Sequence, residues 1–295
     1  MYTIIVSKSD SESIEETLIS LSDCNKPNKY CGTIIVENGP SPSNRELVQS
    51  LDSNLDTYYI HVQKGGKTNA LNVALRRLDT GLIFFSDDDV RFDPDVLTAY
   101  YDAGQQYGPG HFFGGPFDVK YETPPPNWLL DYLPPSAKGC GFDDNAEVDS
   151  SFTGFLGFNW GAFVSDLKQA GKFDPRKGPG SSTGSTGDET DMQRRLVEIG
   201  TEARYVPGGR FTHLLTEKNC TPSWALRRSF RSGVKDGLNY AKEEHNSVFP
   251  PPWLLKANLN QLYGMAANFK REQKYFDYKY YFIYHIGFTK GIYLK

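Results

Sequence analysis

Three consecutive aspartates, Asp87, Asp88 and Asp89, are the part of the sequence best suited to chemistry. They follow a short apolar run, 81–85, that predicts a buried strand, and they precede a helix predicted to begin at Pro94. In open α/β sheets, ligands bind at the carboxyl ends of the strands. Adjacent carboxylates repel one another without a cation, and Mg²⁺ and Mn²⁺ prefer oxygen ligands and often bridge to phosphates. The run therefore predicts a metal and diphosphate site, and a solvated acidic turn is the alternative.

A second acidic group, Asp188 and Glu189, begins a helix predicted to end near Ile199. A loop rich in glycine and serine, 177–187, leads into this helix. Acidic side chains in a first helical turn are also stabilised by the helix dipole. The residues alone therefore leave two interpretations open, a functional acidic pair and an ordinary helix start.

The elements that must position these acids alternate regularly in the first part of the chain. Four predicted strands are each followed by a predicted helix, and this alternation favours a parallel sheet with helices on both faces. The strands span 2–6, 33–36, 58–62 and 81–85, and the helices span 13–21, 44–51, 68–78 and 94–107. The glycine fingerprint of dinucleotide-binding domains is absent after the first strand, which argues against a dinucleotide cofactor.

Size and composition limit the classes of protein to which the sequence can belong. The 295 residues suffice for one large domain, with or without an appendage. The formal net charge is -4, so no overall basic field favours a nucleic-acid partner. Cys24, Cys31, Cys140 and Cys220 have no metal-ligand spacing and no dense disulfide pattern, and we expect reduced thiols in a cytoplasmic protein. We recognise no signal peptide and no apolar run long enough to span a bilayer.

The second half of the chain is less regular. Its predicted elements are strands at 114–119, 203–206 and 210–213 and a basic amphipathic helix at 223–240, with a proline-rich stretch at 123–135 and a glycine-spaced aromatic segment at 152–163. The tail from Pro250 onward is rich in aromatic residues. We expect it to pack on the domain, and a dimer contact or a membrane-surface contact are the alternatives.

When both acidic motifs are considered together, the sequence resembles family 2 glycosyltransferases of the glycosyltransferase-A fold. The resemblance covers roughly Tyr2 to Tyr240 and depends on the order and spacing of five motifs. These are Val36-Glu37-Asn38-Gly39, Gly66-Lys67-Thr68-Asn69-Ala70-Leu71-Asn72, Asp87-Asp88-Asp89, Gly157-Phe158-Asn159 and Gly187-Asp188-Glu189. The resemblance implies an α/β fold with a Rossmann-like mixed central sheet flanked by helices and a C-terminal helical and aromatic extension.

The resemblance also implies a domain organisation. Residues 1–245 would form the catalytic domain, with a nucleotide-binding half at 1–110 and an acceptor-binding half at 111–245. Residues 246–295 would form the extension, which packs on the domain or mediates association. Within the acceptor half, the proline-rich stretch with Trp128 is the candidate for acceptor contacts.

The resemblance assigns a role to each acidic motif. Asp87 and Asp89 would hold a divalent ion, Mn²⁺ or Mg²⁺, on the diphosphate of a nucleotide sugar, with Asp88 between them. The later acid pair would supply the general base that removes a proton from the acceptor hydroxyl. By position this base is Glu189, but the order of the two acids is reversed relative to the family, so Asp188 stays open. In-line attack would invert the anomeric centre.

Further site residues follow from the same resemblance. The expected contacts to the nucleotide sugar come from Glu37, Lys67, Asn72, Asn159, Trp160 and Arg228, and His213 is expected as a third metal ligand. Several of them have a plainer alternative: a surface strand end for Glu37, a solvated helix start for Lys67, a core side chain for Trp160 and a structural role for His213. Arg228 lies at helical spacing from Arg227 and Arg231, and the alternative for this row is a solvated helix face.

The leading hypothesis is an inverting, metal-dependent glycosyltransferase acting on a glycan, glycolipid or polysaccharide acceptor, in polysaccharide biosynthesis at the cell envelope. A UDP-sugar donor is expected by analogy with the family. A nucleotidyltransferase acting on sugar phosphates would normally have a glycine-rich phosphate loop after the first strand, and 7–10 is not one. A non-catalytic sugar-binding protein on the same fold is the third hypothesis, against which the intact acids argue. We expect a cytoplasmic protein, with a homodimer or attachment to the inner face of the membrane as roles for the tail.

Overall fold

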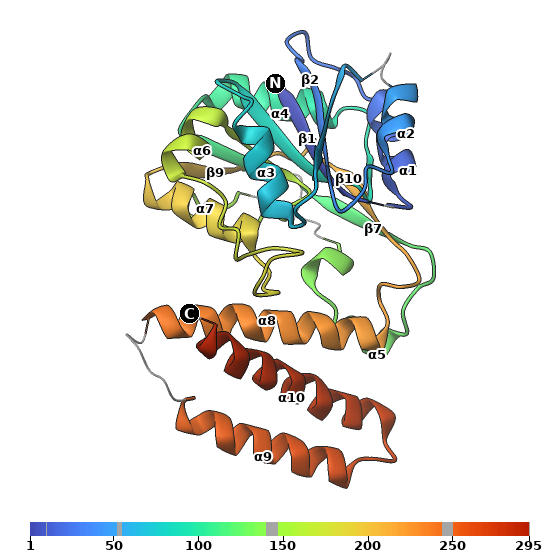
Figure 1. Ribbon diagram of the computed structural model, residues 1–295, viewed down its shortest axis with the longest axis vertical. Coiled ribbons are helices and arrows are strands. Elements are labelled where there is room, and N and C mark those ends of the chain that lie inside the picture. Colours follow the sequence, from blue (N-terminus) through green and yellow to red (C-terminus); the bar gives the residue numbers. More distant parts are fainter. Residues whose placement is uncertain (10, 52–54, 140–146, 244–249, 295) are drawn as a thin grey trace.

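The computed structural model describes the chain except residues 10, 52–54, 140–146, 244–249 and 295. Cys140 and the predicted domain boundary between residues 245 and 246 therefore lie outside the described residues. An α/β part forms the upper half of the molecule in Figure 1, and three long C-terminal helices form a layer below it. The predicted α/β fold class with a C-terminal helical extension is confirmed.

A seven-stranded mixed sheet forms the centre of the α/β part, in the strand order β3-β2-β1-β4-β8-β6-β9. β3, β2, β1 and β4 run parallel, whereas β8 is antiparallel to both of its neighbours. The strands span Tyr2–Lys8 (β1), Gly32–Asn38 (β2), Thr57–Val62 (β3), Leu82–Asp87 (β4), His111–Gly114 (β6), Trp160–Phe163 (β8) and Glu202–Tyr205 (β9). Because Val6 pairs with both Val36 and Asp87, the carboxyl ends of β1, β2 and β4 meet at one edge, where such sheets bind ligands.

A small three-stranded sheet adjoins this edge, in the order β5-β10-β7. Its strands span Val90–Phe92 (β5), Phe117–Tyr121 (β7) and Phe211–Leu215 (β10). The prediction of a single strand across Gly114 and Phe117 is wrong, because Gly114 ends β6 in the main sheet and Phe117 begins β7 in the small one. Pro116 between them has no N–H for a strand ladder. His213 of β10 pairs with Val90, directly after the three aspartates.

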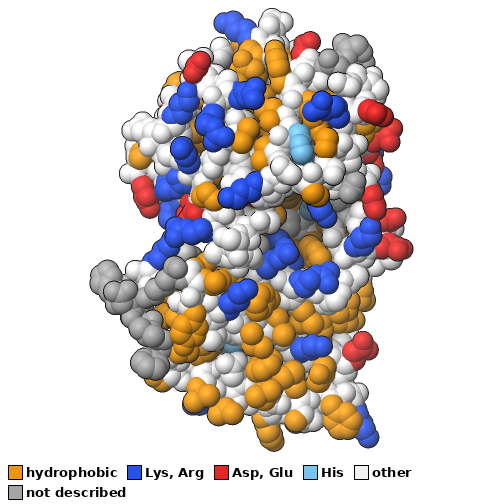
Figure 2. Space-filling model, in the orientation of Figure 1, with side chains coloured by type: hydrophobic (Ala, Val, Ile, Leu, Met, Phe, Trp, Pro, Cys, Tyr) orange, Lys and Arg blue, Asp and Glu red, His pale blue; other side chains and the backbone are white. Residues whose placement is uncertain are grey.

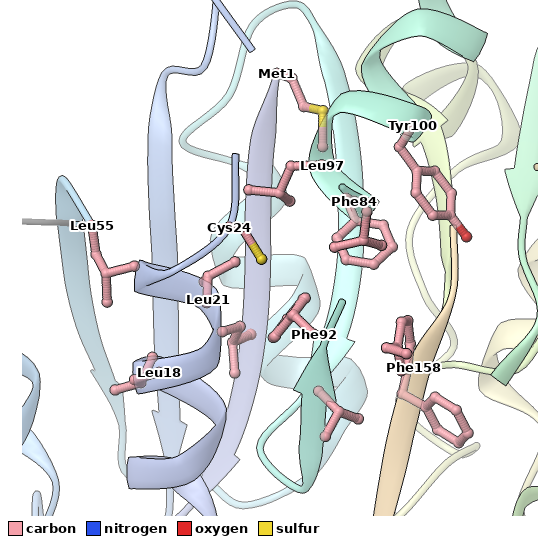
Figure 3. Close-up of a cluster of buried hydrophobic side chains, with 14 of the residues drawn as sticks. Met1, Leu18, Leu21, Cys24, Leu55, Phe84, Phe92, Leu97, Tyr100 and Phe158 are labelled. Carbon is pink, nitrogen blue, oxygen red and sulfur yellow. The ribbon is translucent and has the colours of Figure 1, made fainter. Parts of the chain in front are cut away.

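Apolar side chains on the two faces of the main sheet fill two cores. Ile5 and Phe84 pack toward α1 and α4, and Ile4 and Phe85 pack toward α3, α6 and α7. Figure 3 shows the first core. The helices of the α/β part span Ile14–Ser22 (α1), Arg45–Ser50 (α2), Lys67–Leu75 (α3), Val96–Tyr107 (α4), Asn127–Leu130 (α5), Val164–Ala170 (α6) and Asp188–Glu198 (α7), with a 3-10 turn at Pro135–Ala137 (η2). Each large buried apolar side chain contributes about 1.5–3 kcal/mol, so both faces hold the strand ends firmly.

The C-terminal layer consists of α8 (Pro222–Glu243), α9 (Pro252–Ala267) and α10 (Glu272–Tyr293). α10 lies along α8, and α9 packs against α10 (Figure 1). α8 and α10 approach closely through glycines: a Cβ at Gly287 would lie 2.1 Å from the backbone oxygen of Phe230. Trp128 and Tyr132 of the proline-rich stretch contact the ring of Phe276 on α10 at centroid distances of 5.1 Å. None of the described helices is long and apolar enough to cross a membrane.

Candidate active site

The three aspartates lie where β4 ends, and neighbouring elements hold the first two. Asp87 forms an ion pair with Lys67, the first residue of α3. Oδ2 of Asp88 accepts hydrogen bonds from Ser7 Oγ at 2.8 Å and from the backbone N–H of Lys8 at 3.0 Å, both at the end of β1. Burial and the adjacent carboxylates raise the pKa of Asp88 to about 6. Each of these two carboxylates is thus fixed by a donor of the surrounding fold.

Lys67 joins the two acidic motifs. Its side chain is only 11% exposed. Burial alone would lower its pKa, but the charges of Asp87, Asp188 and Glu189 raise that pKa above the usual value. Gly157 leaves room at this point, because a Cβ there would lie 3.1 Å from Lys67 Nζ and 3.4 Å from the carboxyl carbon of Glu189. The lysine is therefore charged and lies between carboxylates that come from distant parts of the sequence.

Asp89 faces His213 of β10. Nε2 of His213 lies 3.5 Å from Asp89 Oδ2, and its Nδ1 donates a hydrogen bond to the backbone oxygen of Ser136 at 2.7 Å. The imidazole ring also stacks on Phe158 at 4.5 Å. Burial alone would lower the pKa of His213, but its contact with Asp89 raises it. The ring is therefore held from three sides, with Nε2 directed at the carboxylate.

These residues fit a divalent metal ion in part. Among the described residues, no group of three or more His, Cys, Asp and Glu side chains is arranged to hold one. Oδ1 of Asp89 is buried and has no hydrogen-bond partner within the described part of the chain. An orphaned carboxylate oxygen beside an imidazole that a backbone carbonyl orients is typical of metal ligands. Asp89 and His213 therefore fit the ion, whereas Asp87 is engaged by Lys67.

Asp188 and Glu189 begin α7, after Gly187 in a left-handed conformation with φ of 89° that favours glycine. Asp188 is 3% exposed, and a Cβ at Gly178 would lie 2.7 Å from its carboxyl group. Burial raises the pKa of Asp188 well above its usual value, and its Oδ2 has no hydrogen-bond partner among the described residues. Glu189 is partly buried and lines a cavity. The two acids therefore differ in environment although they are adjacent.

Two cavities meet at the aspartates. The smaller, about 280 Å³, is lined by Lys67, Asp87, Asp89, Pro134, Pro135, Ser136, Leu156, Gly157, Phe158, Pro179, Thr186, Gly187, Asp188, Glu189, His213, Leu215, Asn219, Trp224 and Arg228. The larger, about 670 Å³, is lined by Val6, Lys8, Ser9, Asn38, Gly39, Pro40, Gly65, Gly66, Lys67, Asp87, Asp88, Asp89, Pro179, Gly180 and Arg231. Figure 2 shows basic side chains around the crease between the α/β part and the C-terminal helices. Eight of the predicted site residues line these cavities.

Glu37 does not line either cavity. Its side chain is fully buried, and both of its carboxylate oxygens are used inside the fold. Oε1 accepts a hydrogen bond from the backbone N–H of Ser43 at 2.8 Å, and Oε2 accepts from the N–H of Asn44 at 3.0 Å and from Tyr59 at 2.7 Å. Glu37 thus anchors the loop that leads into α2, and this arrangement gives no support to the expected contact with a nucleotide base.

Three further predicted residues lie away from both cavities. Asn72 exchanges two hydrogen bonds of 2.9 Å with the backbone of Phe173. Asn159 accepts from Tyr100 at 2.5 Å and donates to two backbone oxygens at 2.8 and 3.1 Å. Trp160 is a core side chain that stacks on a phenylalanine of β4 at 4.6 Å. These side chains stabilise the fold, so the expected contacts with a nucleotide sugar find no support in their positions.

Sequence analysis missed other residues that line the cavities. Trp224 of α8 lines the smaller cavity, and its ring lies 5.7 Å from the guanidinium carbon of Arg228. Ser136 and Lys8 also line the site. A signal was present for two of them: Lys8 ends the first strand at the ligand edge, and Trp224 lies four residues before Arg228 on one face of its helix.

Solved structures of glycosyltransferases share this fold. The mannosyltransferase PcManGT from Pyrobaculum calidifontis, in complex with GDP-Man and Mn²⁺, is 16% identical over 99% of this chain and 87% of its own, with a TM-score of 0.59. TarS from S. aureus is 14% identical over 90% of this chain, with a TM-score of 0.53, and this chain spans 43% of TarS. GalNAc-T7 with UDP, GalNAc and Mn²⁺ is 12% identical over 85% of this chain and 51% of its own, with a TM-score of 0.56. At these identities, the likeness establishes the fold.

Sequence comparisons identify the family. A search of curated proteins found no match. The family model of glycosyl transferase family 2 matches residues 2–171, which is more than half of the chain and includes Lys67 and the three aspartates. The predicted resemblance is thereby confirmed. The chain belongs to glycosyl transferase family 2 and has the glycosyltransferase-A fold.

Proposed function

We propose that the protein transfers a sugar from a nucleoside diphosphate sugar to a hydroxyl group of a glycan, glycolipid or polysaccharide, with inversion at the anomeric carbon. One observation carries the proposal: the two cavities meet at Lys67, Asp87 and Asp89, and of the two cavities only the smaller is lined by Glu189. The nucleoside occupies the larger cavity and the diphosphate lies at the junction. The donor sugar and the acceptor share the smaller cavity.

Positive charge for the diphosphate comes from several elements. Lys67 lies at the junction, Arg228 lines the smaller cavity and Arg231 lines the larger one. A divalent ion, Mn²⁺ or Mg²⁺, would be held by Asp89 and His213, and it would offset the charge that develops on the departing nucleoside diphosphate. The lysine and the arginines orient the diphosphate and stabilise the same charge from fixed positions.

Glu189 takes the proton from the acceptor hydroxyl. Burial raises the pKa of the neighbouring Asp188, so this carboxyl group favours its protonated form and is the poorer proton acceptor. Glu189 is partly exposed to the smaller cavity and needs no rearrangement to reach a hydroxyl there. Attack from the side of this cavity, opposite the departing nucleotide, inverts the anomeric centre.

The substrate class is proposed from chemistry and from relatives. Solved relatives of this fold hold UDP-GlcNAc, GDP-Man or UDP. A UDP-sugar donor and a role in polysaccharide biosynthesis at the cell envelope are proposed by analogy with the family. Membership in glycosyl transferase family 2 favours this activity over a nucleotidyltransferase. Measured turnover would separate an enzyme from a non-catalytic sugar-binding protein.

The test is thermal stability of the protein with UDP, GDP or CDP, each with and without Mn²⁺. A ligand at 100 times its dissociation constant stabilises the folded state by about 2.7 kcal/mol, so one nucleotide is expected to raise the melting temperature when Mn²⁺ is present. Asp89→Asn is expected to abolish this metal-dependent shift. Asp102→Asn, on the exposed side of α4, is the matched control and should keep it. No shift with any of the three nucleotides would contradict the proposal.

A further inference from the structure

α9 presents apolar side chains to the outside of the molecule. Leu255, Leu259 and Tyr263 follow one another at helical spacing and are 68%, 58% and 77% exposed. Leu262 and Trp253 flank this stripe and are also exposed. Figure 2 shows hydrophobic side chains crowded over the C-terminal helices. A contiguous apolar surface of this kind marks a contact site rather than an ordinary solvated face.

The inward face of the same helix is not purely apolar: Leu254 packs on Phe288 and Ile292 of α10, but polar side chains are buried beside it. Asn258 Oδ1 and Gln261 Oε1 are buried and have no hydrogen-bond partner in the part of the chain that the structure describes. A surface helix in water normally has polar side chains on its outward face, whereas the outward face of α9 carries the leucine and tyrosine stripe. The apolar stripe therefore needs an apolar environment that lies outside the chain.

The charged side chains around α9 limit which kind of surface can cover the apolar stripe. The sequence from Pro250 to Arg271 contains no acidic residue, although the whole chain has a formal net charge of -4. Lys256, Lys270 and Arg271 lie in this segment and are exposed, and Phe269 beside Lys270 is exposed as well. Basic side chains next to an apolar stripe match a surface that is apolar inside and anionic outside.

We propose that α9 lies in the surface of an anionic lipid membrane, with its apolar stripe among the acyl chains and its basic side chains at the headgroups. The helix has 16 residues, whereas a span needs about 20, so it lies in the surface instead of crossing. Trp253 and Tyr263 carry amphipathic rings of the kind enriched at the membrane interface.

A second copy of the chain suits this face less well. Two copies that met through α9 would bring Lys256, Lys270 and Arg271 of each against those of the other, and like charges repel.

The membrane proposal does not depend on the proposed transfer reaction, because it concerns a surface outside both cavities. α10 lies between α9 and α8, which provides Trp224 and Arg228 to the smaller cavity (Figure 1). Docking through α9 would thus hold that cavity near the membrane.

The experiment is flotation of the full-length protein with vesicles of phosphatidylcholine alone or mixed with phosphatidylglycerol. We expect flotation with the mixed vesicles, and weaker flotation as salt is added, since salt screens the attraction. Leu259→Glu is expected to weaken partitioning about tenfold or more, because it removes apolar area and adds a charge at the interface. Ile19→Glu, at an exposed apolar position on α1, is the matched control and should bind like the original protein. The melting temperatures of both variants verify that they fold.

Two outcomes would overturn the proposal. One is the absence of flotation with phosphatidylglycerol vesicles at low salt, or flotation that Leu259→Glu leaves unchanged. The other is a dimer in analytical ultracentrifugation that Leu259→Glu dissociates while no vesicle binds, which would assign the face to a second copy. Loss of nucleotide binding would overturn the proposed function and leave this result unaffected, so the two failures are distinguishable.

Discussion

The α/β part and the C-terminal layer are built in different ways. In the α/β part, apolar side chains fill both faces of the sheet and charged side chains gather where the strands end. In the C-terminal layer, α8 and α10 meet through glycines, and α9 turns a stripe of apolar side chains outward. The arrangement in the α/β part fixes charged groups against one another, which suits a catalytic site. The arrangement in the C-terminal layer provides one wall of the site and a surface for attachment.

Within the comparison of the two regions, the largest effect is expected from two buried lysines in the α/β part. Lys67 pairs with Asp87 and Lys177 pairs with Asp191, but of the two lysines only Lys67 lines the cavities. Lys67→Met is expected to lower turnover roughly 100- to 1,000-fold, because it removes a positive charge beside the departing diphosphate. It should also lower the free energy of unfolding by about 1–3 kcal/mol, since it leaves the partly buried carboxylate of Asp87 without its partner. Donor hydrolysis and urea unfolding measure the two effects.

Lys177→Met is the matched control. It breaks the ion pair with Asp191 and is expected to lower stability while turnover per folded molecule is retained. If both variants lost turnover equally, Lys67 would act on activity through the fold alone. The distinction between Lys67 as a site residue and Lys177 as a residue that only stabilises the fold would then be wrong.

A smaller effect, on stability first, is expected at the glycine contact of the C-terminal layer. The Cβ of Gly287→Ala would lie 2.1 Å from the backbone oxygen of Phe230, so α8 and α10 must move apart. Overpacking of this kind costs about 1–3 kcal/mol, which urea unfolding would measure. We expect turnover to fall more than nucleotide binding, because Trp224 and Arg228 of α8 line the smaller cavity.

Gly65→Ala is the control for the stability effect alone, because Gly65 lines the larger cavity. A Cβ at Gly65 would meet no atom of the described residues within 4 Å, so stability should change little. Unchanged stability in Gly287→Ala would contradict the close helix contact. Equal losses of nucleotide binding and turnover in Gly287→Ala would mean that the α/β part and the C-terminal layer do not act separately.

The sequence predicts the α/β part well because its signals are local. The apolar run before Asp87 marks a buried strand, and parallel strands place their carboxyl ends at one edge, so the acidic site follows from local pattern and topology. The position of His213 beside Asp89 depends on the pairing of β10 with β5, which are far apart in the sequence. Only the family resemblance predicted it. A long-range pairing has no local sequence signal.

Other predictions depend on tertiary packing, which the sequence does not reveal. Asn159 lies in a motif that indicates ligand contact and Trp160 directly follows it, yet buried partners take up the amide and the ring. In α9, helical spacing separates two faces but does not tell which one turns inward. The positions of Asn258 on the inside and Leu259 on the outside became visible only from the packing against α10.

The most direct test of the central claim is nucleoside diphosphate release by Glu189→Gln, measured with the donor whose nucleotide stabilises the protein. The substitution keeps the size of the side chain and removes its ability to accept a proton. We predict that the metal-dependent stabilisation by nucleotide is unchanged and that release falls to the background rate. Full turnover in this variant would contradict the assignment of Glu189 as the base.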